Sequence, residues 1–210
     1  MNNIKLLPIC ILLISFGLIS KDGYSQKRNS IGITLRIETT SERTDSIDNC
    51  FTKTAQKNWN PTIGFSYERI ISKHFQLGIE LNYRQYKNEL AIPIPYGSNS
   101  TAIRYITVTE AFITMPIQVK YKSNILNISL GPTLDYYLSW KQEKDEIYNF
   151  KINSYERFFN QKISLGLLGS VSKSLDVNNQ ISIEPSFYYN QIFSFTRAYY
   201  GFAIATRFKF

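Results

Sequence analysis

The stretch "LNISLGPTLDYYLSW", residues 126–140, alternates between apolar and polar side chains. One face carries the large apolar residues Leu126, Ile128, Leu130, Leu134, Tyr136, Leu138 and Trp140. The other face carries small or polar residues: Asn127, Ser129, Gly131, Thr133, Asp135 and Ser139. Successive side chains of a β-strand point to opposite faces, so this period predicts a strand with one apolar and one polar face. Pro132 interrupts the apolar face and predicts a local bulge.

The same period of two recurs along the rest of the chain. It is found in residues 30–38, 61–69, 75–84, 102–121, 160–172, 180–190 and 198–210. No linker, tandem repeat or low-complexity tract interrupts these segments, and their Ile, Tyr, Phe and Thr favour strands over helices. The sequence therefore predicts an all-β domain of eight antiparallel strands in up-and-down order.

The connections between these strands alternate in length. Long ones occupy residues 39–60, 88–100 and 141–157, whereas "SKH" (72–74), "KSN" (122–124) and "KSLDVNNQ" (173–180) are short. Long connections therefore gather at one end of the predicted sheet and tight turns at the other. An even strand number puts both termini at the tight-turn end.

Residues 1–25 differ from the rest of the chain. Lys5 precedes an apolar run of fifteen residues, "LLPICILLISFGLIS", and the small residues Gly23 and Ser25 follow. This pattern predicts a secretory signal peptide at 1–25, because the run is shorter than the roughly 20 residues of a spanning helix. The mature domain would then be residues 26–210, and Cys50 its only cysteine.

A closed eight-stranded sheet can point its apolar face inward, as in a soluble barrel that binds a lipophilic ligand, or outward to lipid. Three observations favour the outward solution. The polar face carries glycines that fit a narrow lumen, together with six basic and five acidic residues: Arg36, Glu68, Glu80, Arg84, Arg104, Glu110, Lys120, Asp135, Lys162, Glu184 and Arg207. We expect these charges to pair inside a plugged lumen, since eight strands leave an interior just filled by side chains.

The second observation is a set of aromatic residues near the strand ends, as in the girdles at membrane interfaces. They are Tyr83, Tyr86, Tyr96, Tyr121, Trp140, Tyr148, Tyr188, Tyr189, Tyr199, Tyr200, Phe208 and Phe210. The third observation is the export signal combined with the asymmetry of loops and turns. Together they predict a transmembrane β-barrel.

Four segments carry a resemblance to a known family: "FQLGIELNYR" (75–84), "AFITMPIQVKYK" (111–122), "LNISLGPTLDYYL" (126–138) and the terminal "RFKF" (207–210). From about residue 29 to 210 the chain resembles small outer-membrane β-barrels of Gram-negative bacteria, of the PorT-like or "outer membrane protein beta-barrel domain" type. The resemblance implies outer-membrane lipid as surroundings, with periplasmic termini and extracellular long loops. It also implies that the barrel assembly machinery reads Phe210 and Phe208, and that a periplasmic or secretion-system protein is a further partner.

Little in the sequence points to catalysis. His74 is the only histidine and lies in a predicted turn, opposite the end where a lipid-modifying enzyme would need its His–Ser–acid group. One histidine and one mature cysteine do not make a metal site. We therefore expect no enzyme activity, no cofactor and no nucleic-acid partner, and a structural, adhesive or secretion-accessory role. A lipid-modifying enzyme is the weaker alternative.

The basic residues of the tight-turn end are Lys27, Arg28, Lys73, Lys122, Lys173, Arg207 and Lys209. Two interpretations stay open: a rim against lipid headgroups, or a surface for an acidic periplasmic partner. The apolar segment "AIPIPYG", residues 91–97, is expected in an outer loop, where it caps the barrel or touches a partner.

Overall fold

The computed structural model describes residues 29–41, 44–48, 51–55, 59–96, 100–143, 162–193 and 197–210. The predicted signal peptide, Cys50 and Tyr148 lie outside these ranges. No helix within them is long and apolar enough to cross a membrane.

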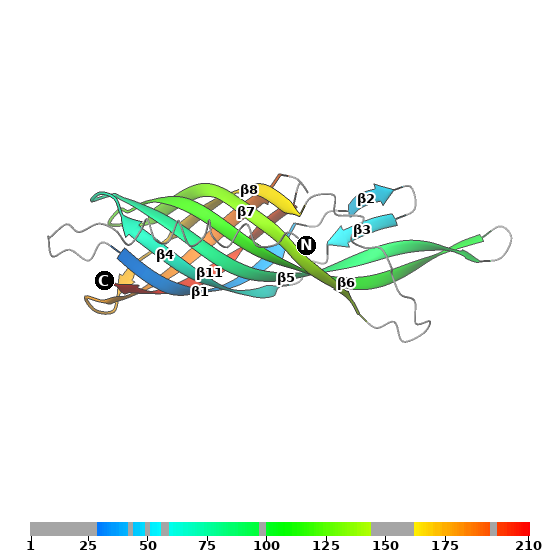
Figure 1. Cartoon of the computed structure of the whole chain (residues 1–210), viewed down its shortest axis with the longest axis horizontal. Coiled ribbons are helices and arrows are strands. Elements are labelled where there is room, and N and C mark those ends of the chain that lie inside the picture. Colours follow the sequence, from blue (N-terminus) through cyan, green and yellow to red (C-terminus); the bar gives the residue numbers. More distant parts are fainter. Residues whose placement is uncertain are drawn as a thin grey trace, which may run out of the picture.

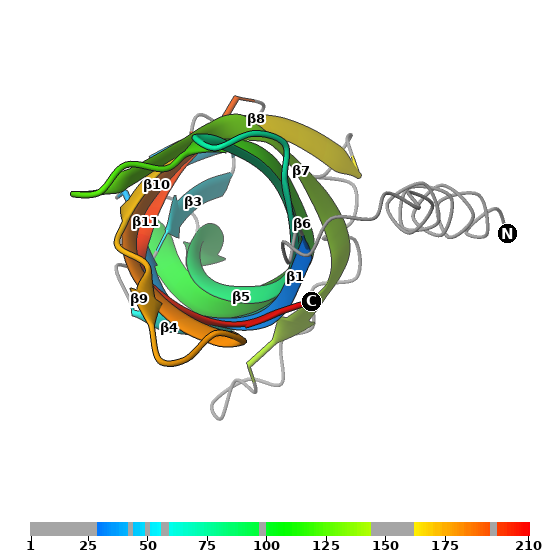
Figure 2. The ribbon, with the colours of Figure 1, turned by 90° about the vertical axis from the view of Figure 1, so that its left-hand side faces the viewer.

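Eight antiparallel strands of the described residues close into a ring (Figures 1 and 2). In ring order they are β1 (Asn29–Thr40), β4 (Asn60–Ile70), β5 (Phe75–Tyr96), β6 (Ser100–Tyr121), β7 (Asn127–Gln142), β8 (Ile163–Ser172), β10 (Ile181–Ile192) and β11 (Arg197–Lys209). Short strands β2 (Thr44–Asp48), β3 (Phe51–Ala55) and β9 (Leu175–Asp176) add to it. The predicted eight-stranded up-and-down barrel is confirmed.

The first and last strands close the ring. β1 and β11 pair from Ser30↔Lys209 to Thr40↔Tyr199. Beyond this ladder, the Phe210 N–H donates to the Asn29 carbonyl at 2.9 Å, and the Asn29 N–H donates to the Phe210 carbonyl at 3.2 Å. This pairing leaves no open edge between β1 and β11, where unpaired backbone groups could not be hydrated by lipid.

Short turns join β4 to β5, β6 to β7, and β8 to β10 at the end of the ring that holds Phe210, which we call the turn end. At the other end, the loop end, β5 and β6 run on as a long hairpin (Figure 1).

The apolar face of the sheet points outward. In β1 the exposed residues are Ile31, Ile33, Leu35 and Ile37, while Thr34, Arg36 and Glu38 between them are buried. β11 follows the same rule, with Phe202 62% exposed and its neighbour Ala203 5% exposed. Exposure of such an apolar surface is unfavourable in water and favourable in lipid. The prediction of an outward apolar face is confirmed, and the soluble, ligand-filled barrel is wrong because the interior is lined with charge.

The predicted bulge at Pro132 is wrong. The ladder between β6 and β7 keeps one register on both sides of Pro132, with Pro116↔Thr133 and Val119↔Leu130. The register shifts instead where Ala111 pairs with Ser139 and Phe112 with Tyr137, which leaves Leu138 as the extra residue. A bulge changes which side chains point inward, so the alternation reverses after Leu138.

Residues 88–100, expected as a loop, are largely strand. The ladder between β5 and β6 continues from Asn88↔Val108 to Tyr96↔Ser100. β3 pairs along the other side of β5 as far as Ala91, which leaves Pro93 and Pro95 on the part of β5 without a second described neighbour. Proline lacks an N–H and is tolerated in such edge positions, so the two prolines do not end the strand.

Candidate functional site

A group of four charges fills the lumen nearest the turn end. We call it the charge quartet: Glu68 of β4, Lys120 of β6, Glu184 of β10 and Arg207 of β11, all buried. The Arg207 Nη2–Glu68 Oε1 and Lys120 Nζ–Glu184 Oε1 distances are both 2.9 Å. Lys120 also pairs with Glu68, and Arg207 with Glu184. Two cations and two anions thus compensate each other where water is scarce.

A second pair lies in the middle of the lumen. Arg36 of β1 pairs with Glu80 of β5. The Arg36 guanidinium carbon lies 4.7 Å from the centroid of the Tyr188 ring, a cation–π geometry. Tyr188 therefore connects the Arg36–Glu80 pair to the next layer of side chains, which lies closer to the loop end.

Glu38 organises the layer closer to the loop end. Its carboxylate is fully buried and accepts hydrogen bonds from the hydroxyls of Tyr86 at 2.5 Å, Thr62 at 3.0 Å and Tyr188. The Arg84 Nε lies 3.5 Å from Glu38 Oε1 and is equally buried. The predicted set of lumen charges leaves out Glu38, although the alternation along residues 30–38 puts it on the same polar face as Arg36.

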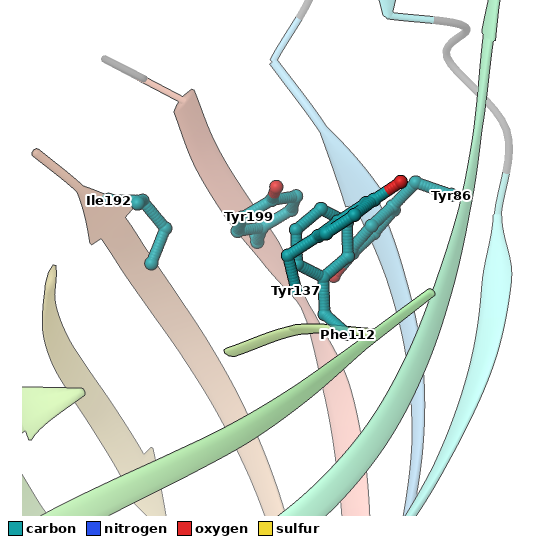
Figure 3. Packing of buried hydrophobic residues seen from close by; sticks show 5 residues of the cluster. All are labelled: Tyr86, Phe112, Tyr137, Ile192 and Tyr199. Carbon is teal, nitrogen blue, oxygen red and sulfur yellow. The ribbon is translucent and has the colours of Figure 1, made fainter. Parts of the chain in front are cut away.

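Four aromatic side chains and one isoleucine form a buried hydrophobic cluster that contacts Glu38 through Tyr86 (Figure 3). This aromatic plug comprises Tyr86, Phe112, Tyr137, Ile192 and Tyr199, with Trp140 packed against it. The Tyr86 and Tyr199 rings stack at 4.6 Å between centroids, and Phe112 meets Tyr137 edge-on at 5.5 Å. A hydrophobic layer thus lies between the charged lumen and the loop end.

The predicted outer girdle is therefore wrong for four of its members. Tyr86, Tyr188 and Tyr199 are buried inside, and Trp140 turns inward because of the bulge at Leu138. Tyr83, Tyr121, Tyr189, Phe208 and Phe210 are exposed outside. Exposure outside the barrel is what an interfacial girdle requires.

The remaining predicted lumen residues lie in different surroundings. Glu110 is fully buried and accepts a hydrogen bond from Asn88 at 2.7 Å, and Asp135 is also buried. Arg104 lies in β6, and its side chain is outside the described part. Placing Lys162 in the lumen was wrong: it precedes β8 and is exposed, because the strand that would direct it inward has not yet begun.

Between the charge quartet and Tyr188, the described side chains leave little free space. The cavity between the charge quartet and Tyr188, lined also by Arg36 and Glu80, has a volume of about 30 Å³. That is room for about one water molecule, far from a continuous channel.

Solved structures with similar folds include Ail, the attachment invasion locus protein of Yersinia pestis, at 9% identity and a TM-score of 0.46, over 87% of this chain and 99% of that one. OprG of Pseudomonas aeruginosa has 12% identity and a TM-score of 0.47, over 86% and 96% of the two chains. The protease OmpT of Escherichia coli has 8% identity and a TM-score of 0.39, over 91% and 99%.

No curated protein has a matching sequence. The profile of the family described as "Outer membrane protein beta-barrel domain" matches residues 24–202, most of the chain. The chain therefore belongs to this family of outer-membrane β-barrels of Gram-negative bacteria.

Proposed function

We propose that the protein is a non-enzymatic anchor in the outer membrane that presents the β5–β6 hairpin to a binding partner. The hairpin arm, residues 89–96 and 100–107, extends past the last rung between β6 and β7, Val108↔Gln142. Ile103 and Tyr105 on this arm are 61% and 63% exposed. Large apolar side chains exposed beyond a barrel are typical of an interaction surface, and this observation carries the proposal.

The closed lumen supports an anchor rather than a pore. Charge pairs and the aromatic plug occupy the interior at successive levels, with about 30 Å³ left between two of them. A solute would have to displace buried, mutually compensating charges, which costs several kcal/mol.

The position of His74 supports a role without catalysis. The ring is exposed at the turn end, stacks 5.9 Å from Tyr121, and its Nδ1 lies 3.4 Å from the Lys122 carbonyl. A general base needs a nucleophile within hydrogen-bond reach, and His74 contacts a backbone oxygen and a tyrosine ring instead.

We infer that the loop end faces outside the cell and the turn end faces the periplasm. Long loops and the hairpin arm lie at one end, and tight turns with Phe210 at the other, which is the usual asymmetry of outer-membrane barrels. A secretion-accessory role, implied by the PorT-like resemblance, stays a prediction.

Adherence of cells that display the protein tests this function. Such cells should adhere to at least one of a panel of immobilised extracellular proteins and glycans. The double variant Ile103→Ser/Tyr105→Ser should lose this adherence, because it removes the exposed apolar side chains of the hairpin arm.

Two controls accompany that assay. Heat-modifiable migration on gels should be the same for variant and parent, which shows that the barrel is folded. Lys87→Gln, which changes an exposed ion pair with Glu143 below the arm, should adhere like the parent. Undiminished adherence of the double variant would contradict the proposal.

A further inference from the structure

A large vestibule, lined mostly by polar side chains, opens at the turn end of the barrel, which is the end that faces the viewer in Figure 2. Its volume is about 790 Å³, within the range of small-ligand sites. Its lining comes from strands and turns around the ring: Asn29, Ser30, Glu68, Ile70, Ile71, Ser72, Lys73, Gln76, Lys122, Ser174, Asp176, Asn179, Ser182, Glu184, Arg207 and Lys209. The carboxylates and guanidinium of the charge quartet contribute to this lining, and Lys120 is paired with them.

The charges of the vestibule do not balance. The quartet is neutral as a whole, and Lys209 Nζ pairs with Asp176 Oδ1 at 2.5 Å. Two lysines of the lining, Lys73 and Lys122, have no ion pair among the described residues. Counted together with Lys120, which lies behind the lining, the described residues of the vestibule therefore carry an excess of two positive charges.

Lys122 is the deeper of these two cations. It is half-buried, whereas Lys73 is exposed at the rim. Burial and the nearby ammonium groups of Lys209 and Lys120 lower the pKa of Lys122, although Glu68 and Asp176 partly oppose this. An anion beside Lys122 would relieve the repulsion among these cations.

Hydrogen-bond donors surround the excess charge. Ser72, Ser182 and Asn179 line the same vestibule, and the Gln76 amide lies deeper within it. A phosphate ester carries close to two negative charges and several acceptor oxygens, so it matches both the excess charge and the donors.

We propose that the vestibule is a binding site for a small phosphate-bearing anion, with Lys122 as its main cation and Lys73 at its entrance. A soluble phosphate monoester offers close to two negative charges, and the phosphodiester of a phospholipid headgroup offers one with the same kind of acceptor oxygens. This site lies at the opposite end of the barrel from the hairpin arm, so the test of the site is independent of the test of the proposed adhesive function.

Calorimetric titration of the detergent-folded barrel with inorganic pyrophosphate at low ionic strength tests the site. We expect saturable binding that Lys122→Gln weakens by about tenfold, since one charge-assisted contact is lost. Lys87→Gln, at the other end of the barrel, should bind like the parent. Absence of binding, or equal affinity of Lys122→Gln and Lys87→Gln, would overturn the proposal.

A folding control and a direct readout make the result specific. Lys122→Gln should retain heat-modifiable migration. NMR titration of the Lys122 side-chain carbon next to Nζ should give a pKa that rises when pyrophosphate is added. Affinity should be full below the lowered free-state pKa and decline as pH rises through it; a pKa unmoved by pyrophosphate would overturn the proposal.

Lipid competition distinguishes the two sources of phosphate. If vesicles of phosphatidylglycerol displace pyrophosphate and phosphatidylcholine vesicles do not, an anionic headgroup is the natural occupant. If neither displaces it, a soluble ester is the occupant. Both results support the site.

Discussion

At the scale of single residues, Glu38 shows how much of the interior depends on one carboxylate. It accepts hydrogen bonds from three hydroxyls and lies 3.5 Å from the buried Arg84. Removing its charge leaves Arg84 without its nearest anion in a site that excludes water. Such a loss typically costs about 3–5 kcal/mol.

We therefore expect Glu38→Gln to lower the free energy of unfolding by several kcal/mol, measured by urea titration of the barrel in lipid vesicles. The matched control is Glu143→Gln, which breaks the exposed pair with Lys87. That change should cost below about 1 kcal/mol, because solvent screens the pair. Equal stability of the two variants would show that Glu38 does not hold the lumen together.

At the scale of strands, two glycines hold neighbouring backbones close together. A Cβ placed on Gly131 of β7 would lie 1.8 Å from the Ile117 carbonyl oxygen, and one on Gly201 of β11 would lie 2.1 Å from that of Ile37. A Cβ on Gly78 of β5 would meet the flexible Glu68 side chain at 3.5 Å, an ordinary contact. Composition alone does not distinguish these glycines; their place in the sheet does.

Gly131→Ala should therefore destabilise the barrel by roughly 1–3 kcal/mol, as overpacking does, whereas Gly78→Ala should be nearly neutral. Thermal loss of heat-modifiable migration in the two variants would measure the difference. The explanation fails if Gly78→Ala is the more damaging change.

The last strand gives a second prediction at this scale. Deleting Phe210 removes two backbone hydrogen bonds to Asn29, whereas Phe210→Ala removes only an exposed ring. If closure is what matters, only the deletion should reduce the amount of folded protein in the outer membrane. If Phe210 acts as an assembly signal, both changes should reduce it. Membrane fractionation followed by gel shift separates these outcomes, and unchanged levels in both variants would refute both roles.

At the scale of the whole molecule, two separate layers of side chains occupy the lumen. The aromatic plug fills the lumen towards the loop end, and the charge quartet fills it near the turn end. In planar lipid bilayers the protein should show no steady conductance. Tyr86→Ala/Tyr199→Ala should also stay closed because the quartet remains, while a sixteen-stranded porin serves as the conducting control. Discrete current steps from the double variant would mean that the quartet is not a seal.

The sequence by itself determined the architecture. Alternation with a period of two is a local property, so residues 126–137 and 198–210 indicated their own strands and faces, and an even strand number with one apolar face left few closed arrangements. The same reasoning predicted outward Ile128 and Leu130, which are 57% and 56% exposed.

Only the tertiary structure decided the interior. The bulge at Leu138 depends on how β7 pairs with β6, and it turned Trp140 inward. The extension of β5 through Pro93 depends on having β6 beside it. The partners of Glu38 come from β4, β5 and β10, and no local pattern shows which residues of separate strands meet at one level of the lumen. Alternation gives the side to which a residue points, but the stagger between strands fixes its neighbours, and that stagger exists only once the ring has closed.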